Sequence, residues 1–111
     1  MSKVITIKDP KDDSVVYTLG YSRDIVRNME RAGFKQDGIS DTPATSIPML
    51  FHGAFLLNHQ RVSQHIIDDL WARIPDKPGF ISALVALYNE PLDAMLDEPD
   101  KKSGEVKWEM N

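Results

Sequence analysis

The chain has 111 residues, 41% of them hydrophobic and 27% charged, a composition typical of one globular domain with a modest core rather than of a disordered or membrane protein. Its 13 basic and 17 acidic side chains leave a net charge of −4, so it lacks the cationic balance expected of a nucleic-acid-binding protein. The absence of cysteine excludes disulfides, thiolate metal sites and cysteine nucleophiles.

The opening stretch, MSKVITIKDPKDD, lacks the apolar run of a secretory signal peptide. No other stretch approaches the ~20 consecutive apolar residues of a membrane span. We therefore expect a cytoplasmic protein whose partners are neither nucleic acids nor membranes.

Two runs of β-branched and aromatic residues, VITIK and VVYTL, flank the turn-forming sequence DPKDDS. They predict a β-hairpin in which residues Val4–Lys8 pair with Val15–Leu19. Because an isolated hairpin is marginally stable in water, one of its faces is expected to lie on helices.

The segment GYSRDIVRNMERAGF predicts the first helix, with Ser22 as its N-cap. Gly33 is expected to adopt the left-handed conformation that ends the helix, with Phe34 folding back toward Met29 as in a Schellman cap. The buried face of this first helix is predicted to consist of Ile25, Val26, Met29 and Ala32. The sequence that follows the helix, KQDGISDTPAT, predicts a loop of about ten residues.

The segment SIPMLFHGAFLLNHQ has apolar residues around much of its helical circumference, which predicts the central helix of the fold. Pro48 is expected in its first turn, where proline is tolerated. Gly53 and Ala54 would allow a neighbouring helix to approach closely.

The segment VSQHIIDDLWARIP predicts a third helix, capped by Ser63 and ended by Pro75. The fourth helix is predicted in PGFISALVALYNEPLDAML, where Pro91 is expected to kink or break it because the ring clashes with the carbonyl of Leu87. The apolar face of the third helix is predicted to be Ile66, Ile67, Leu70, Trp71 and Ile74. That of the fourth is predicted to be Phe80, Ile81, Leu84, Val85 and Tyr88.

The predicted fold is therefore mainly α: a small domain of about four helices with an N-terminal β-hairpin and a polar C-terminal tail. We assign residues 1–96 to the domain and residues 97–111 to the charged tail. The sequence contains no internal repeat.

Candidates for catalysis are weak. His52 and His59 are seven residues apart, which spreads them over about 10 Å of helix, too far to bind one metal ion together. Asp68 and Asp69 are adjacent in a helix and point in different directions, so they are poor candidates for a shared-proton pair. We expect no enzyme activity, no cofactor and no metal. A metal-dependent enzyme built around His52 and His59 is the competing hypothesis.

Apolar residues near the C-terminus are better candidates for contact with another protein. Leu92, Met95 and Leu96 follow Pro91, and methionine adapts to varied partner surfaces. The alternative interpretation is that this turn packs back on Phe34 or on the hairpin.

In the tail, EVKWEM alternates apolar and charged residues with the period of a strand. This stretch either adds a strand to the hairpin edge, in its own chain or in another, or remains disordered until a partner arrives. Both the hairpin edge and the tail are available for self-association, so a homo-oligomer is also considered. The predicted partner-binding residues are Met49, Leu92, Met95, Leu96, Val106 and Trp108.

The order of these segments resembles that of the tail assembly chaperones of long-tailed bacteriophages, and most closely the prophage group from Gram-positive bacteria. The resemblance lies in the hairpin VITIK...VVYTL, then SRDIVRNMERAGF, IPMLFHGAFLLNHQRVSQHIIDDLWARI and ALYNEPLDAMLDEPDKKSGEVKWEMN. It covers essentially the whole chain and depends on hydrophobic pattern and order rather than on a catalytic motif.

The resemblance implies a small helical protein of the host bacterial cytoplasm that binds the tape measure protein and keeps this long helical chain soluble. It also implies help in recruiting tail tube protein, without catalysis. The alternative from another class is a structural subunit of the virion, such as a tail-completion or connector protein.

Overall fold

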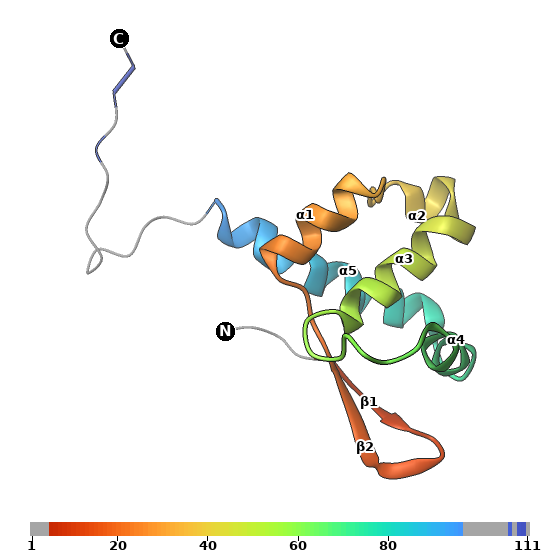
Figure 1. The fold of residues 1–111 in the computed structure, drawn as a ribbon. Coiled ribbons are helices and arrows are strands. Elements are labelled where there is room, and N and C mark those ends of the chain that lie inside the picture. Colours follow the sequence, from red (N-terminus) through yellow and green to blue (C-terminus); the bar gives the residue numbers. More distant parts are fainter. Residues whose placement is uncertain (1–4, 97–106, 108, 111) are drawn as a thin grey trace.

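A computed structural model of the chain describes residues 5–96, 107, 109 and 110. Within these residues, a two-stranded antiparallel hairpin precedes five helices (Figure 1). The predicted mainly α fold with an N-terminal hairpin is confirmed, but the described part has five helices instead of about four. The elements are β1 (Ile5–Asp9), β2 (Asp12–Leu19), α1 (Arg23–Arg31), α2 (Gly38–Asp41), α3 (Pro43–Phe55), α4 (Gln64–Ala72) and α5 (Lys77–Ala94).

The hairpin has the predicted pairing, with Ile5 opposite Leu19 and Ile7 opposite Tyr17. Tyr17 and Leu19 are buried, since this face of the hairpin lies on α3. The ring of Tyr17 contacts the ring of Phe55 on α3, with centroids 5.7 Å apart. The expectation that one hairpin face lies on helices is therefore confirmed.

The outer edge of β2 is occupied near its C-terminal end. The backbone N–H of Thr18 donates to Nε2 of His59 at 2.8 Å, and Nδ2 of Asn58 donates to the Thr18 carbonyl at 3.2 Å. Two residues further, the N–H of Gly20 donates to the carbonyl of Ala54 at 3.0 Å. Side chains that follow α3, together with a backbone carbonyl in its last turn, thus take the place of a third strand.

Helix α1 begins and ends as its sequence predicts. The Ser22 hydroxyl accepts a hydrogen bond from the N–H of Ile25 at 3.2 Å. At the other end Gly33 has φ of +102°, and the N–H of Phe34 donates to the carbonyl of Met29 at 2.9 Å, as in a Schellman motif. The predicted buried face is correct for Val26 and Met29, and Ile25 is half-buried against the core. It is wrong for Ala32, which is exposed in an open groove between α1 and α3.

The ten-residue loop predicted after α1 is partly wrong, because it contains the short helix α2 and the first residues of α3. Helix α3 begins at Pro43, where a missing N–H costs no intrahelical hydrogen bond. Pro48 therefore lies inside the helix rather than in its first turn, and it leaves the carbonyl of Ala44 without its usual donor.

Helix α3 is the central helix, as predicted: it contacts β2 and each of the other four helices. A Cβ atom added at Gly53 would lie 2.6 Å from Sδ of Met29, so the glycine permits the close approach of α1. The buried side chains of α3 are almost inaccessible, with exposures of 0–1% for Leu50, Phe51, Ala54 and Phe55.

The caps and ends of the last two helices agree only in part with the predictions. Ser63 caps α4 by accepting from the N–H of Ile66 at 3.3 Å, as predicted, but the Ile66 side chain is exposed instead of forming part of the core. Helix α5 continues through Pro91 to Ala94, so the predicted break is wrong. Pro91 lies near the end of α5, where only one turn of helix remains to be disrupted.

The core contains one buried residue of α5 that the predicted stripe omitted, Leu87, which is 3% exposed. Tyr21 is also buried: its hydroxyl donates to the carbonyl of Leu50, and its ring lies edge-on to that of Tyr88 with centroids 5.4 Å apart. Burial strongly raises the pKa of the Tyr21 hydroxyl. The hairpin, α1, α3 and α5 therefore share one core.

Candidate protein-binding surface

A groove of about 190 Å³ lies between α1 and the last turns of α5. Its apolar lining comes from Val26 on α1 and from Pro91, Leu92 and Met95 at the end of α5. Three charged side chains of α1 complete the lining: Arg23, Arg27 and Glu30. Two of the predicted partner-binding residues, Leu92 and Met95, thus lie in one groove.

Exposure of the apolar side chains increases along the end of α5. Leu92 is half-buried and packs against the core. Met95 is 56% exposed and Leu96 is 87% exposed. In the described part of the chain, the apolar surface after Leu92 is therefore open to contact with another molecule.

The charges at the groove are unevenly paired. Arg27 Nη2 lies 2.9 Å from Asp24 Oδ1, but both side chains are more than half exposed, so this ion pair contributes little. Arg23 makes no ion pair or hydrogen bond with any side chain of the described residues. Glu30 lies at the other end, beside Tyr88, whose pKa is raised first by burial and second by the Glu30 charge.

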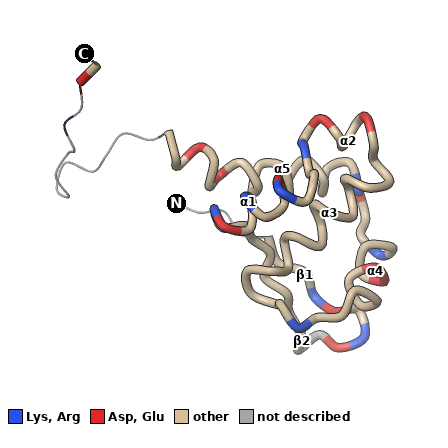
Figure 2. The backbone as a smooth tube through the Cα atoms, turned by 45° about the horizontal axis from the view of Figure 1, so that its top comes forward, with Lys and Arg blue, Asp and Glu red and all other residues tan. Residues whose placement is uncertain are grey.

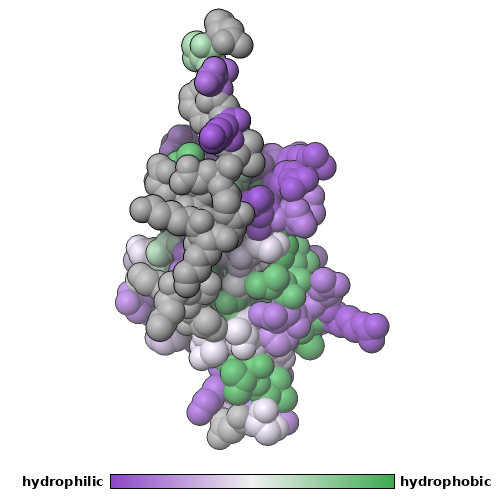
Figure 3. Space-filling view, turned by 90° about the vertical axis from the view of Figure 1, so that its left-hand side faces the viewer, coloured by the Kyte–Doolittle hydropathy of each residue, from purple (hydrophilic) through white to green (hydrophobic). Residues whose placement is uncertain are grey.

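Acidic and basic residues are spread over the helices and the hairpin (Figure 2). On the face that contains the end of α5, hydrophobic surface forms separate areas bordered by hydrophilic side chains (Figure 3). Apolar areas with charged borders are the arrangement expected of a protein that contacts others and still resists aggregation.

Met49 lies elsewhere. It is half-buried in a second groove, of about 430 Å³, between α1 and α3. This second groove is lined on the α1 side by Asn28, Met29 and Ala32, whereas Val26 and Glu30 of the same helix line the groove at α5. Helix α1 therefore separates Met49 from Leu92 and Met95, and the predicted binding residues do not form one site.

Val106 and Trp108 lie outside the described residues. Their neighbours Lys107, Glu109 and Met110 are described, are exposed and have no strand structure. The predicted strand is therefore not present at these three positions. The roles of Val106 and Trp108 in partner binding stay predictions.

A further apolar area was not singled out from the sequence. Leu56 and Leu57 follow the last residue of α3 and are each 44% exposed, and Ile66 on α4 is 41% exposed. The pattern predicted Ile66 to lie on the apolar face of its helix, and the end of α3 at Phe55 leaves Leu56 and Leu57 outside the central helix.

Two of the three histidines have structural contacts. Nε2 of His52 lies 2.9 Å from Oδ1 of Asp68, which links α3 to α4, and His59 binds β2 as described above. Within residues 5–96 and the described positions of the tail, no cluster of three potential ligands has metal-binding geometry.

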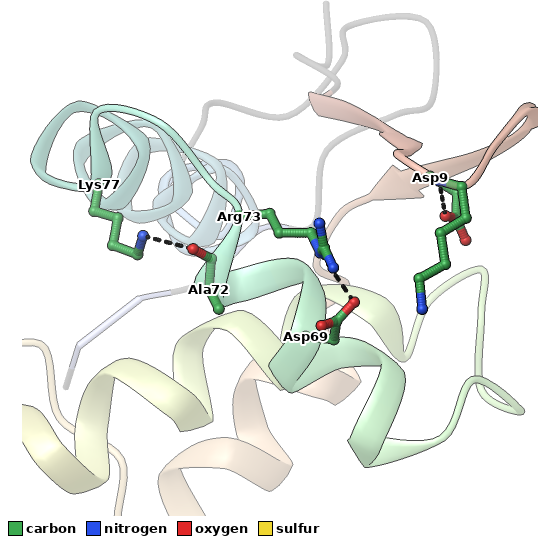
Figure 4. A network of polar contacts seen from close by, with 6 residues as sticks. Asp9, Asp69, Ala72, Arg73 and Lys77 are labelled. Carbon is green, nitrogen blue, oxygen red and sulfur yellow. Dashed lines mark hydrogen bonds and ion pairs between the residues drawn. The ribbon is translucent and has the colours of Figure 1, made fainter.

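The other polar contacts stabilise turns and helix ends (Figure 4). Nε of Arg73 donates to Oδ2 of Asp69 at 3.2 Å, and Nζ of Lys77 donates to the carbonyls of Ala72 at 3.5 Å and of Ile74 at 3.0 Å. The Lys77 ammonium also lies 5.9 Å from the ring centroid of Trp71. These contacts hold the connection between α4 and α5.

No helix among the described residues has the length and apolar character needed to cross a membrane.

Comparison with known proteins gives one match. No curated protein and no solved structure matches the chain. One family model matches residues 1–111, and the chain therefore belongs to that family, which is described as a domain of unknown function, DUF5055.

Proposed function

We propose that the protein is a tail assembly chaperone of a long-tailed phage or prophage. In this proposal it binds the tape measure protein in the bacterial cytoplasm, keeps that long helical chain soluble and assists assembly of the tail tube, without catalysis. The proposal combines the resemblance of the segment order with one structural observation, the exposed apolar turn at the end of α5.

The physical argument concerns Met95 and Leu96. A chaperone for a chain with many apolar helical faces needs apolar surface that adapts to different side chains, and unbranched methionine is suited to this. Full burial of a side chain of this size contributes about 1.5–3 kcal/mol, so two such residues would supply useful but reversible affinity. Reversibility suits a chaperone that must release its client into the growing tail.

The proposal is tested by co-expression with a tagged tape measure protein followed by pull-down. The double variant Met95→Asp/Leu96→Asp is expected to lose retention, because two carboxylates replace the apolar contact. Both residues are exposed, so the helical circular dichroism should match that of the unmodified protein.

The matched control is Ile66→Asp, which places a carboxylate at a similarly apolar, partly exposed position on α4. This variant should still be retained. Retention of the double variant would show that the client binds elsewhere. Detection of the protein in purified mature virions would instead favour the structural-subunit alternative, since an assembly factor should be absent there.

A further inference from the structure

The shape of the groove between α1 and α5 fits one kind of partner element. Its walls are two helices, and its lining on α1 extends from Arg23 to Glu30, which is about 10 Å of helix or two turns. In the apolar lining of the groove, Val26 is buried and Leu92 is half-buried. A partner helix that projects apolar residues three or four positions apart would fill such a groove.

The charge at the groove differs from that of the whole protein. Arg23 and Arg27 are one helical turn apart on α1, whereas the chain carries a net charge of −4. Arg23 has no ionic partner among the described residues, and Arg27 has only the exposed contact with Asp24. Glu30 is acidic but lines the end of the groove opposite Arg23. Asp93 is exposed and is not part of the groove lining.

We propose that the groove binds an amphipathic helix whose apolar face is flanked by acidic side chains, placed against Arg23 and Arg27. This proposal rests on the proposed function, since it identifies the kind of client segment that the chaperone recognises. The net charge alone would favour a basic client. At contact distance the attraction of the two arginines outweighs the effect of the net charge, because salt screens charges more than about 8 Å away at physiological ionic strength. Arginine also binds carboxylates with two parallel hydrogen bonds.

The test uses two labelled helical peptides of ~15–20 residues, long enough to form a helix. Both carry the same leucine face, flanked by glutamates in one peptide and by lysines in the other. Binding to the full-length protein is measured by fluorescence anisotropy. The glutamate peptide should bind at least about fivefold more tightly at ~0.1 M salt, and the difference should shrink as salt is raised.

The variant Arg23→Glu/Arg27→Glu should reverse this preference. The control Arg61→Glu/Arg73→Glu changes the net charge by the same amount on other elements and should leave the preference unchanged. Circular dichroism of both variants verifies that the fold is kept.

Equal binding of the two peptides, tighter binding of the lysine peptide, or binding of neither would overturn the inference. If the tape measure protein is still retained in the pull-down, the proposed function survives that result. If the glutamate peptide binds as expected while the tape measure protein is not retained, the inference stands and the proposed function fails.

Discussion

The second half of α5 and the turn that follows its last residue contain similar apolar residues but have opposite surroundings. Leu84, Leu87 and Tyr88 are at most 3% exposed, whereas Met95 is 56% and Leu96 is 87% exposed. The first three of these residues belong to the buried core, whereas the end of the helix borders α1 only at the groove and extends beyond α3 (Figure 1). Apolar spacing shows which side of a helix is apolar, but the elements opposite decide whether that side becomes core or binding surface.

The largest expected effect separates the two parts of α5 directly. Leu84→Ala should lower the free energy of unfolding by about 2–5 kcal/mol, because Leu84 is fully buried and its truncation leaves a cavity. Leu96→Ala should change it by less than about 0.5 kcal/mol, as for other exposed positions. Urea unfolding followed by circular dichroism measures both. Similar losses in the two variants would show that the last turn is also part of the core.

A smaller effect is expected at the border between the two parts. Leu92→Ala should cost about 1 kcal/mol, since Leu92 packs against the core but is only half-buried. Met95→Ala, one turn later, should have little effect on unfolding. If Leu92→Ala is as neutral as Met95→Ala, the border lies before Leu92, and Leu92 belongs entirely to the binding surface.

The smallest effect concerns Tyr88, the last residue of the buried part. Because burial raises its pKa above the ordinary value near 10, the stability contributed by the neutral hydroxyl is complete below that pH and is lost as the pH rises above it, through the raised pKa of the folded state. Tyr88→Phe should therefore lose less stability than the unmodified protein between about pH 9 and 11. Urea midpoints across this range measure the difference. An unchanged pH dependence would show that the Tyr88 hydroxyl is hydrated.

Local signals in the sequence predicted three of the helix ends correctly. Ser22 and Ser63 cap helices through hydrogen bonds to residues three positions later, and Gly33 ends α1 through its own backbone conformation. Each of these features depends on a few neighbouring residues, so the sequence is sufficient. The hairpin pairing was predictable for the same reason, because one short turn sets its register.

Features that depend on distant elements were predicted poorly. The exposure of Ala32 and Ile66 depends on what lies opposite them, and the continuity of α5 through Pro91 depends on how little helix follows. At the candidate site, Leu92, Met95 and Leu96 were predicted together because they are neighbours in sequence. Met49 lies in a different groove, and only the fold shows that α1 lies between.

The hydrogen bonds that Thr18 and Gly20 make with the end of α3 and the residues after it cause the two edges of the hairpin to differ. An incoming extended segment would find the donors and acceptors at the C-terminal end of β2 already engaged by Asn58, His59 and Ala54. Among the described residues, the sheet contains no strand beyond β1, whose outer backbone groups are those of Thr6 and Lys8. Extension of the sheet by another chain is therefore blocked at the C-terminal end of β2, whereas on the β1 side a lysine discourages uncontrolled stacking.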